Sequence, residues 1–355
     1  MIQSGASRHR PLPRNGRSRA RTTRPLWGVI LAGGEGVRLR QLTHYLCGEE
    51  RPKQYVRVLG RRSLLRQTLD RMSLIIPADR TVVVVHRNHA RFIAEELRGA
   101  STPRLLVQSD DRGTAGAVLL AAQWISWRSP EALIAILPSD HFVQGEIGFM
   151  DRVDEVAAFI DRQNAAQLVL LGAVPTEPDP QYGWIETGDP LGRIGIDPIL
   201  RVRGFLEKPH EEIAQAAWVR GDLWNTAVLV TAVASLVQAG WTVLPAVSDR
   251  LATIEPFSDT EDEESAIAWA YATMPRADFS RAVLERIPSS LATVRLPQGV
   301  LWSDWGTPER VIRSLRTAGI TPSWLRGLGD CDTRVQAPSS PMPVSVRETR
   351  RSEAG

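Results

Sequence analysis

Three glycines and two cationic side chains follow the first strongly apolar segment of this 355-residue chain. Residues 27–32 (Trp-Gly-Val-Ile-Leu-Ala) are typical of a buried strand. The glycines come directly after it: Gly33, Gly34 and Gly36. A backbone without Cβ atoms can turn successive N–H groups inward and bind an anion. Arg38 and Lys53 would add the full positive charges that a chain of phosphates attracts. A glycine-rich turn without a ligand is the alternative.

Known phosphate motifs do not account for this loop. No Gly-Lys-Ser/Thr closes it, and its spacing is not the G-x-G-x-x-G of dinucleotide-binding folds. The residues therefore favour phosphate binding of another type.

Two acidic blocks follow apolar segments that lie far apart in the chain. Pro138-Ser139-Asp140-His141 comes after the strand-like residues 132–137. Asp304 stands 164 positions later, after a short strand expected at residues 299–302. The two acids could share one crevice if that short strand pairs near the edge of the sheet. Two carboxylates with substrate phosphates and water are the usual magnesium arrangement. The alternative is that each aspartate caps a turn or a helix.

Alternating segments predict the fold class. Continuous apolar runs such as residues 81–85, 104–107 and 167–174 alternate with helical patterns, among them residues 63–75 and the almost wholly apolar 115–127. This alternation predicts an α/β protein with a Rossmann-like, mostly parallel sheet and helices on both faces. After Pro175 shorter strands and helices predict a smaller mixed part, with helices at residues 243–253 and 308–318, the latter capped by Thr307. Ligands are expected at the carboxyl ends of the parallel strands.

The composition is that of an ordinary globular protein, with 43% hydrophobic and 23% charged residues. The net charge of +3 depends on the first 24 residues, which hold seven arginines and no acid. The rest of the chain carries 36 basic and 40 acidic side chains, a net charge of −4. The arginine-rich segment has no aromatic residue to stack on a base, so no nucleic-acid partner is expected. No apolar run is long enough for a membrane span, and a cytoplasmic setting is the default expectation.

The glycine loop and the later blocks together resemble the sugar-1-phosphate nucleotidylyltransferases. Gly33-Gly34-x-Gly-x-Arg38-Leu39, followed by Arg51-Pro52-Lys53-Gln54, resembles the signature of that family. Its Pro-Lys-Gln form is similar to the mannose-1-phosphate guanylyltransferase branch, and the likeness extends over about residues 27–318. Residues 43–51 are longer than the usual family link, which predicts a differently shaped lid over the triphosphate.

The resemblance implies a set of site residues. Arg38, Lys53, Asp140 and Asp304 would be catalytic, with Asp140 and Asp304 binding Mg²⁺. The implied nucleotide contacts are Leu31, Ala32, Gly33, Gly34, Gly36, Arg38, Lys53, Gln108, Arg112, Thr114, Ala115 and Ser139. The implied sugar-phosphate contacts are Gly183, Glu207, Lys208 and Asn225. Taken singly, Glu207 and Lys208 could equally be a solvated pair on a strand.

Three positions depart from the guanylyltransferase pattern. Gln108 replaces a glutamate and Gly113 an asparagine near the base, while Ala227 replaces a glycine near the sugar. These departures predict less strict selection of guanine and a shifted hexose preference. Restoring asparagine at position 113 is expected to sharpen base choice.

The resemblance further implies transfer of a nucleotidyl group from GTP to mannose 1-phosphate, which would form GDP-mannose and release pyrophosphate. Three alternatives stay open: the same chemistry on another nucleotide and sugar, a non-catalytic nucleotide-sugar-binding regulatory protein, and nucleic-acid binding through the arginine-rich segment. Disordered tails are expected at residues 1–24 and 326–355, around one nucleotidylyltransferase domain (25–325). Its nucleotide half would cover about residues 25–175 and its sugar-binding half about residues 176–325. The oligomeric state, a homodimer included, is left open.

Overall fold

The computed structural model describes residues 22–98 and 103–326. The chain divides into two compact units, Met1–Ile320 and Thr321–Gly355. In the second unit the described residues include the short helix α12 (Ser323–Arg326). The disorder expected at residues 1–24 and 326–355 falls almost wholly outside the described ranges. Everything below concerns the first unit.

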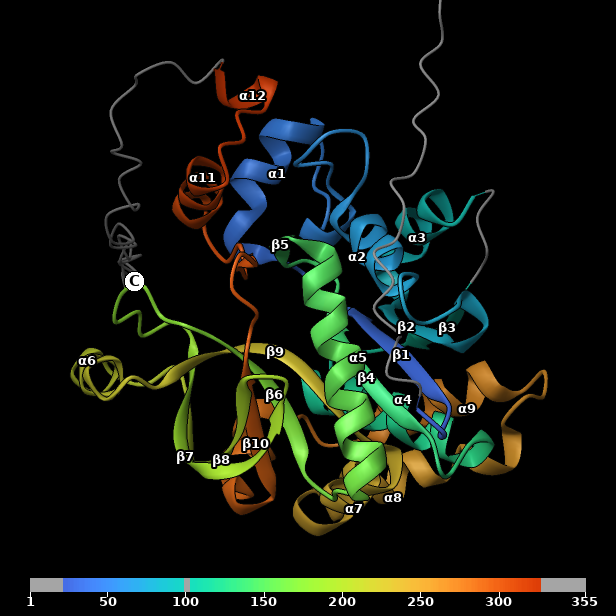
Figure 1. The fold of residues 1–355 in the computed structure, drawn as a ribbon. Coiled ribbons are helices and arrows are strands. Elements are labelled where there is room, and N and C mark those ends of the chain that lie inside the picture. Colours follow the sequence, from blue (N-terminus) through green and yellow to red (C-terminus); the bar gives the residue numbers. More distant parts are fainter. Residues whose placement is uncertain (1–21, 99–102, 327–355) are drawn as a thin grey trace, which may run out of the picture. The chain divides into compact units, whose positions relative to one another are not determined.

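One nine-stranded sheet forms the centre of this unit, in the order β3-β2-β1-β4-β9-β6-β10-β8-β7 (Figure 1). Its strands are β1 (Leu26–Ala32), β2 (Thr81–His86), β3 (Arg104–Gln108), β4 (Leu133–Pro138), β6 (Leu168–Ala173), β7 (Gly183–Ile194), β8 (Asp197–Glu207), β9 (Leu223–Ala232) and β10 (Leu291–Arg295). Of these strands, β9 and β8 run against the other seven. The prediction of a mostly parallel α/β sheet is therefore confirmed.

Helices cover both faces of the sheet. One face packs against α2 (Leu64–Met72), α3 (Ala90–Glu96) and α5 (Glu146–Gln163). The other packs against α4 (Thr114–Arg128), α7 (Val233–Val243), α8 (Pro245–Ala252), α9 (Glu263–Thr273) and α10 (Phe279–Ala282). The valines of β2 alternate between these two layers, Val82 and Val84 toward α4, Val83 and Val85 toward α5. Each valine buried in this way contributes about 1.5–3 kcal/mol, so the continuous β-branched run belongs to a strand covered on both sides.

Several elements differ from the sequence-based expectation. The long link at residues 43–51 contributes to a helix, α1 (Arg40–Cys47), and α6 (Glu211–Arg220) was not predicted. The helix expected at residues 243–253 is found as α8, whereas α7, which ends at Val243, was not predicted. Pro245 opens α8 because its missing N–H is harmless in the first turn of a helix but not inside one. The expected buried helix at 115–127 is confirmed as α4, whose residues 115–125 are all buried.

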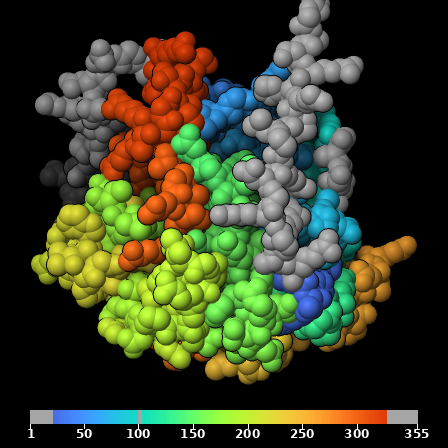
Figure 2. Space-filling view, in the orientation of Figure 1, coloured from blue at the N-terminus to red at the C-terminus, as the bar shows by residue number. Residues whose placement is uncertain are grey.

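A separate two-stranded ribbon joins distant parts of the chain above the sheet. Strand β5 (Phe142–Gln144) pairs antiparallel with β11 (Leu301–Ser303), so that Ser303 lies opposite Phe142. Pairing of the short strand near residue 300 at the edge of the main sheet was one way to bring the two acids together; in the structure that strand pairs with β5 instead. Orange residues before α11 (Pro308–Thr317) accordingly lie against green residues from the middle of the chain (Figure 2). Thr307 caps α11 as predicted, its hydroxyl accepting a bond from the N–H of Arg310.

Among residues 22–98 and 103–326, no helix combines the length and the apolar character needed to cross a bilayer.

Candidate active site

The glycine loop after β1 is held by one buried side chain. The amide nitrogen of Gln54 donates to the carbonyl oxygens of Ala32 (2.9 Å) and Gly34 (2.8 Å). Gly36 adopts a φ of +61°, and a Cβ atom there would lie 2.9 Å from the Cβ of Lys53. A side chain at position 36 would therefore be strained and would displace Lys53. The loop and the Pro-Lys-Gln segment are thus closely packed and hydrogen-bonded to each other.

A cavity of about 290 Å³ opens at this loop, and we call it the phosphate pocket. It is lined by Gly36, Val37, Arg38, Leu39, Lys53, Asp140, His141, Asp304, Trp305 and Gly306. The four side chains predicted to be catalytic are therefore brought together: Arg38, Lys53, Asp140 and Asp304. The β5–β11 ribbon closes the 164-residue separation between the two aspartates, because one follows β4 and directly precedes β5 while the other directly follows β11.

Lys53 lies at the centre of the phosphate pocket. Its Nζ atom is 3.0 Å from Oδ2 of Asp140 and donates to the backbone carbonyls of Asp304 (2.6 Å) and Trp305 (3.1 Å). Burial alone would raise the pKa of Asp140, but the positive charge of Lys53 above all outweighs burial, and the pKa of Asp140 lies below its ordinary value. Asp140 is therefore ionised at neutral pH.

Asp304 is held by three groups. Its Oδ1 atom accepts from the hydroxyl of Tyr182 (3.0 Å) and the N–H of Gly306 (3.0 Å). A guanidinium nitrogen of Arg310 donates to Oδ1 (3.0 Å) and to Oδ2 (2.9 Å). Burial raises the pKa of Asp304, but Arg310 above all brings it below the ordinary value. Sequence reasoning missed Tyr182 and Arg310 as parts of this site, although both lie within seven residues of predicted site positions.

The ring of His141 is fixed by Trp302. The indole N–H donates to Nδ1 of His141 (3.2 Å), and the two rings meet edge to face. Burial lowers the pKa of His141, so the ring is neutral at pH 7. The contact with Trp302 thus occupies Nδ1 and fixes the orientation of the ring.

The two carboxylates suit a magnesium ion. Asp140 and Asp304 line the same pocket, and both are ionised because their pKa values are lowered. Magnesium is commonly held by one or two carboxylates, with substrate phosphates and water completing its shell. The donor set therefore fits the predicted metal, with Asp140 and Asp304 as the protein ligands.

Among the predicted nucleotide contacts, Gln108 lies next to the glycine loop. Its Oε1 atom would be 2.6 Å from a Cβ atom at position 33, so Gly33 leaves room for it. Its amide nitrogen donates to the hydroxyl of Tyr271 (2.9 Å), a buried residue of α9 that sequence reasoning missed. Gln108 is thus fixed in orientation at the end of β3, close to the loop.

The segment after Gln108 is bonded to the chain that follows α9. Arg112 donates to the carbonyl oxygens of Tyr271 (2.7 Å) and Ala272 (2.8 Å). The hydroxyl of Thr114 donates to Asp278, and the N–H of Ala115 donates to Ala277. In this structure these predicted nucleotide contacts therefore connect α4 to α9 and α10.

The other predicted nucleotide contacts lie at strand ends. Leu31 and Ala32 close β1, and Leu31 accepts a backbone bond from the N–H of Ser139 (3.1 Å). Ser139 in turn accepts from the hydroxyl of Thr68 (3.3 Å). These residues lie at the carboxyl ends of β1 and β4, where a parallel sheet offers its ligand crevice.

The predicted sugar-side residues converge on one glycine. A Cβ atom at Gly183 would lie 2.8 Å from Oε2 of Glu207 and 3.3 Å from the Cβ of Asn225. Lys208 has a φ of +51°, and its Nζ atom contacts Oε1 of Glu207 (2.8 Å). We call these four residues the sugar cluster: Gly183, Asn225, Glu207 and Lys208. The cluster directly follows Tyr182, whose hydroxyl holds Asp304, so the two predicted halves of the site adjoin.

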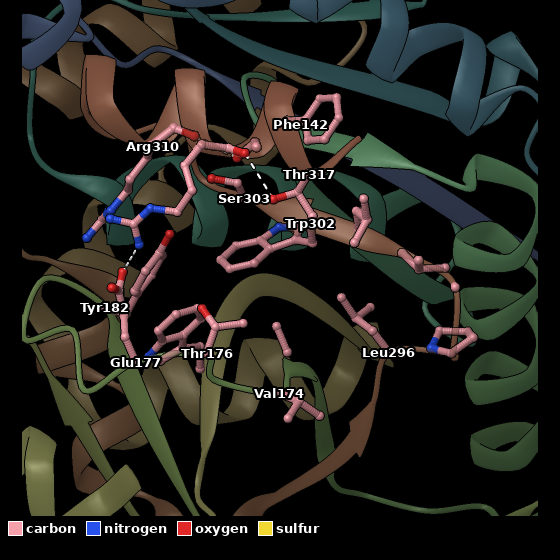
Figure 3. A pocket seen from close by; sticks show the side chains of 18 of the residues that line it. Phe142, Val174, Thr176, Glu177, Tyr182, Leu296, Trp302, Ser303, Arg310 and Thr317 are labelled. Atoms are coloured by element: carbon pink, nitrogen blue, oxygen red, sulfur yellow. Dashed lines mark hydrogen bonds and ion pairs between the residues drawn. The ribbon is translucent and has the colours of Figure 1, made fainter. Parts of the chain in front are cut away.

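A second cavity has a volume of about 330 Å³, and Figure 3 shows residues that line it. Tyr182, Trp302 and Arg310 form part of its wall, and its lining includes the ion pair between Arg313 and Glu177. Tyr182 and Arg310 also hold Asp304, which lines the phosphate pocket. These two side chains therefore stand between the two cavities.

Comparison with known proteins identifies a family. A family model described as "Nucleotidyl transferase" matches residues 27–317. A mannose-1-phosphate guanylyltransferase of Salmonella typhimurium is 29% identical over 293 residues, which cover 79% of this chain and 58% of that protein. A xanthan biosynthesis protein of Xanthomonas campestris is 28% identical over 283 residues, which cover 79% of this chain and 57% of that protein. The chain thus spans little more than half the length of these relatives.

Solved structures have the same fold. A structure titled mannose-1-phosphate geranyltransferase from Thermus thermophilus is 27% identical, with a TM-score of 0.67, and the match covers 82% of this chain and 79% of that one. A structure titled mannose-6-phosphate isomerase from Helicobacter pylori, at 19% identity, has a TM-score of 0.60 and is a likeness of fold.

Proposed function

Because the chain belongs to the nucleotidyl transferase family, we propose that it transfers guanylyl groups from GTP to mannose 1-phosphate, forming GDP-mannose and pyrophosphate. The observation that carries the proposal is the convergence of Arg38, Lys53, Asp140 and Asp304 on one pocket beside the sugar cluster. The name of the Salmonella relative, which shares 29% of the sequence, supports the choice of guanine and mannose.

The proposed reaction is a single displacement at phosphorus. A phosphate oxygen of the sugar phosphate attacks the α-phosphorus of the triphosphate, the bond from that phosphorus to the β-phosphate oxygen breaks, and pyrophosphate leaves. The attacking phosphate is already ionised near neutral pH, so no general base is needed. Nδ1 of His141 already accepts a bond from the indole of Trp302.

Catalysis in this proposal depends on positioning and charge. Arg38 and Lys53 line the pocket and would offset the negative charge that builds on the departing pyrophosphate. Lys208 would pair with the sugar phosphate, and Glu207 and Asn225 would bond to sugar hydroxyls. Magnesium, held by Asp140 and Asp304, would supply further positive charge at the phosphates.

In this proposal, binding of the triphosphate releases Arg38 from a bond with a neighbouring loop. In this structure its guanidinium donates to Oε1 of Gln181 (2.7 Å), a residue of the loop between β6 and β7. A triphosphate in the pocket offers anionic acceptors in place of the neutral amide oxygen, and phosphate oxygens match the guanidinium in both charge and geometry. Nucleotide entry should therefore transfer Arg38 from Gln181 to phosphate.

The test is a panel of nucleoside triphosphates against a panel of sugar 1-phosphates, with pyrophosphate release as the measurement. The proposal expects the highest kcat/KM for GTP with mannose 1-phosphate. A pyrimidine triphosphate in first place would contradict the guanylyl assignment but leave the nucleotidyl chemistry intact. No turnover with any pair, while nucleotide still binds, would favour the alternative of a regulatory binding protein.

A further inference from the structure

Arg310 lies on a surface helix, but its side chain is buried against the carboxylate of Asp304. Its side chain is 8% exposed, whereas that of Arg313, one turn later on α11, is 56% exposed. One guanidinium nitrogen bonds both oxygens of Asp304, and another donates to Oδ2 of Asp179 (2.5 Å). The guanidinium also lies 4.1 Å from the ring centre of Tyr182, next to which it is drawn in Figure 3. Arg310 is therefore fixed on three sides.

These contacts occupy most of the coordinating capacity of Asp304. A carboxylate has about four lone-pair sites on its two oxygens. Oδ1 accepts three bonds, from Tyr182, Gly306 and Arg310, and Oδ2 accepts one from Arg310. Counting the contacts of the described residues, only Oδ2 therefore has a lone pair free for another partner. The missing side chain of Gly306 leaves this oxygen accessible, since a Cβ atom there would lie 2.6 Å from it.

The charges around the free pocket also indicate weak binding of a divalent cation. Lys53 contacts Asp140, Arg310 contacts Asp304, and Arg38 lines the same cavity. With Asp179, which also pairs with Arg310, three cations thus face three carboxylates, so a divalent cation that enters alone meets little net attraction. A triphosphate, which carries several negative charges, reverses that balance.

From these contacts we infer that Arg310 is a positioning residue that occupies Asp304 in the free protein and makes metal binding depend on the triphosphate. The guanidinium holds Asp304 ready beside Asp140, yet it competes with a metal ion for the same oxygens. The free protein accordingly binds divalent cations weakly. This inference rests on the proposed metal role of the two aspartates, but it does not depend on which base or sugar is used.

The test measures Mn²⁺ binding to the free, full-length protein by electron paramagnetic resonance, without nucleotide or sugar phosphate. Arg310→Met should increase the affinity for Mn²⁺ about tenfold, since the competing cation is gone; tenfold in affinity corresponds to about 1.4 kcal/mol. Arg313→Met is the matched control, because Arg313 lies on the same helix and pairs with Glu177 of the same loop, and it should leave Mn²⁺ affinity unchanged.

Arg310→Lys separates charge from geometry. A lysine keeps the positive charge but lacks the planar fork that spans Asp304 and Asp179. Mn²⁺ affinity of the free protein should stay within about threefold of wild type, while kcat falls about tenfold because Asp304 is less well fixed. Arg310→Lys also keeps the inference testable if Arg310→Met does not fold.

Two results would overturn the inference. One is a folded Arg310→Met protein whose Mn²⁺ affinity is unchanged or weaker. The other is an Arg310→Lys protein that binds Mn²⁺ about tenfold more tightly than wild type. Failure of the proposed substrates would look different: the Mn²⁺ titrations would behave as expected, and turnover of GTP with mannose 1-phosphate would be absent.

Discussion

Lys53 places its Nζ atom 3.0 Å from Oδ2 of Asp140 and, with the same ammonium group, bonds the backbone on the C-terminal side of β11. One buried cation thus connects the Pro-Lys-Gln segment, the end of β4 and the β5–β11 ribbon. It follows that Lys53 has a structural and an electrostatic role at once, and that its substitution should change both stability and rate.

Replacing Lys53 by methionine keeps most of the side-chain volume and removes the charge. Loss of one preorganised charged partner typically costs about 3 kcal/mol, so kcat should fall on the order of a hundredfold, more than KM for the triphosphate rises. Steady-state kinetics with each substrate varied in turn measures this. Lys208→Met is the comparison, since Lys208 should act chiefly on KM for the sugar phosphate. An unchanged kcat for Lys53→Met would contradict the assigned role.

Asp140→Asn and Asp304→Asn should each abolish most activity, but they should differ in stability. Asp304 neutralises the buried Arg310 and accepts bonds from Tyr182 and Gly306, whereas Asp140 pairs with Lys53. Either change leaves a buried cation without its carboxylate partner, which typically costs a few kcal/mol. An asparagine at position 140 can keep its oxygen toward Lys53, but both oxygens of Asp304 accept bonds from Arg310, so an asparagine there must also turn an NH2 group toward a donor. The melting temperature of Asp304→Asn should therefore lie below that of Asp140→Asn. Equal melting temperatures would show that Asp179 alone suffices for Arg310.

The backbone conformation of Gly113 changes the effect that is expected from replacing it by asparagine. Its φ is +79° with a ψ of 174°, and a Cβ atom would lie 2.3 Å from the carbonyl oxygen of Ala277. That backbone region is almost restricted to glycine, so Gly113→Asn should destabilise the protein by about 2–4 kcal/mol instead of simply sharpening base choice. Urea unfolding measures the loss. Gly48→Ala separates the effects, because Gly48 has a φ of +71° but no atom near its Cβ position; it should cost only about 1 kcal/mol.

Ala227 has a φ of +57°, a conformation that glycine adopts without cost. Ala227→Gly should therefore leave stability unchanged or raise it by up to about 1 kcal/mol, and it should widen sugar choice, because position 227 follows Asn225 of the sugar cluster. Thermal unfolding and the ratio of kcat/KM for mannose 1-phosphate over glucose 1-phosphate provide the two measurements. A ratio that rises would mean that the alanine methyl group does not restrict the sugar.

The sequence predicted those site residues whose neighbours along the chain already mark them as functional. The glycines, Lys53 and Asp140 lie within or directly beside strand ends, so type and spacing alone indicated them. Arg310 could not be found in this way, because its position on a helix gives no sign that the side chain turns toward Asp304. Tyr271 was missed for a similar reason: its contact with Gln108 spans 163 positions and depends on how α9 packs. The three-residue strand β5 is too short for any periodicity to show.

The β5–β11 ribbon also has a consequence for synthesis. Residues 142 and 303 must meet before Asp140 and Asp304 can act together, and this contact spans some 160 positions of a chain that leaves the ribosome from its N-terminus. The parallel strands β1 to β4 can pair while the remainder is still being translated. A nascent or prematurely terminated chain that ends before β11 would thus present a glycine loop without its second acid. Catalytic competence would arise only once β11 has been translated.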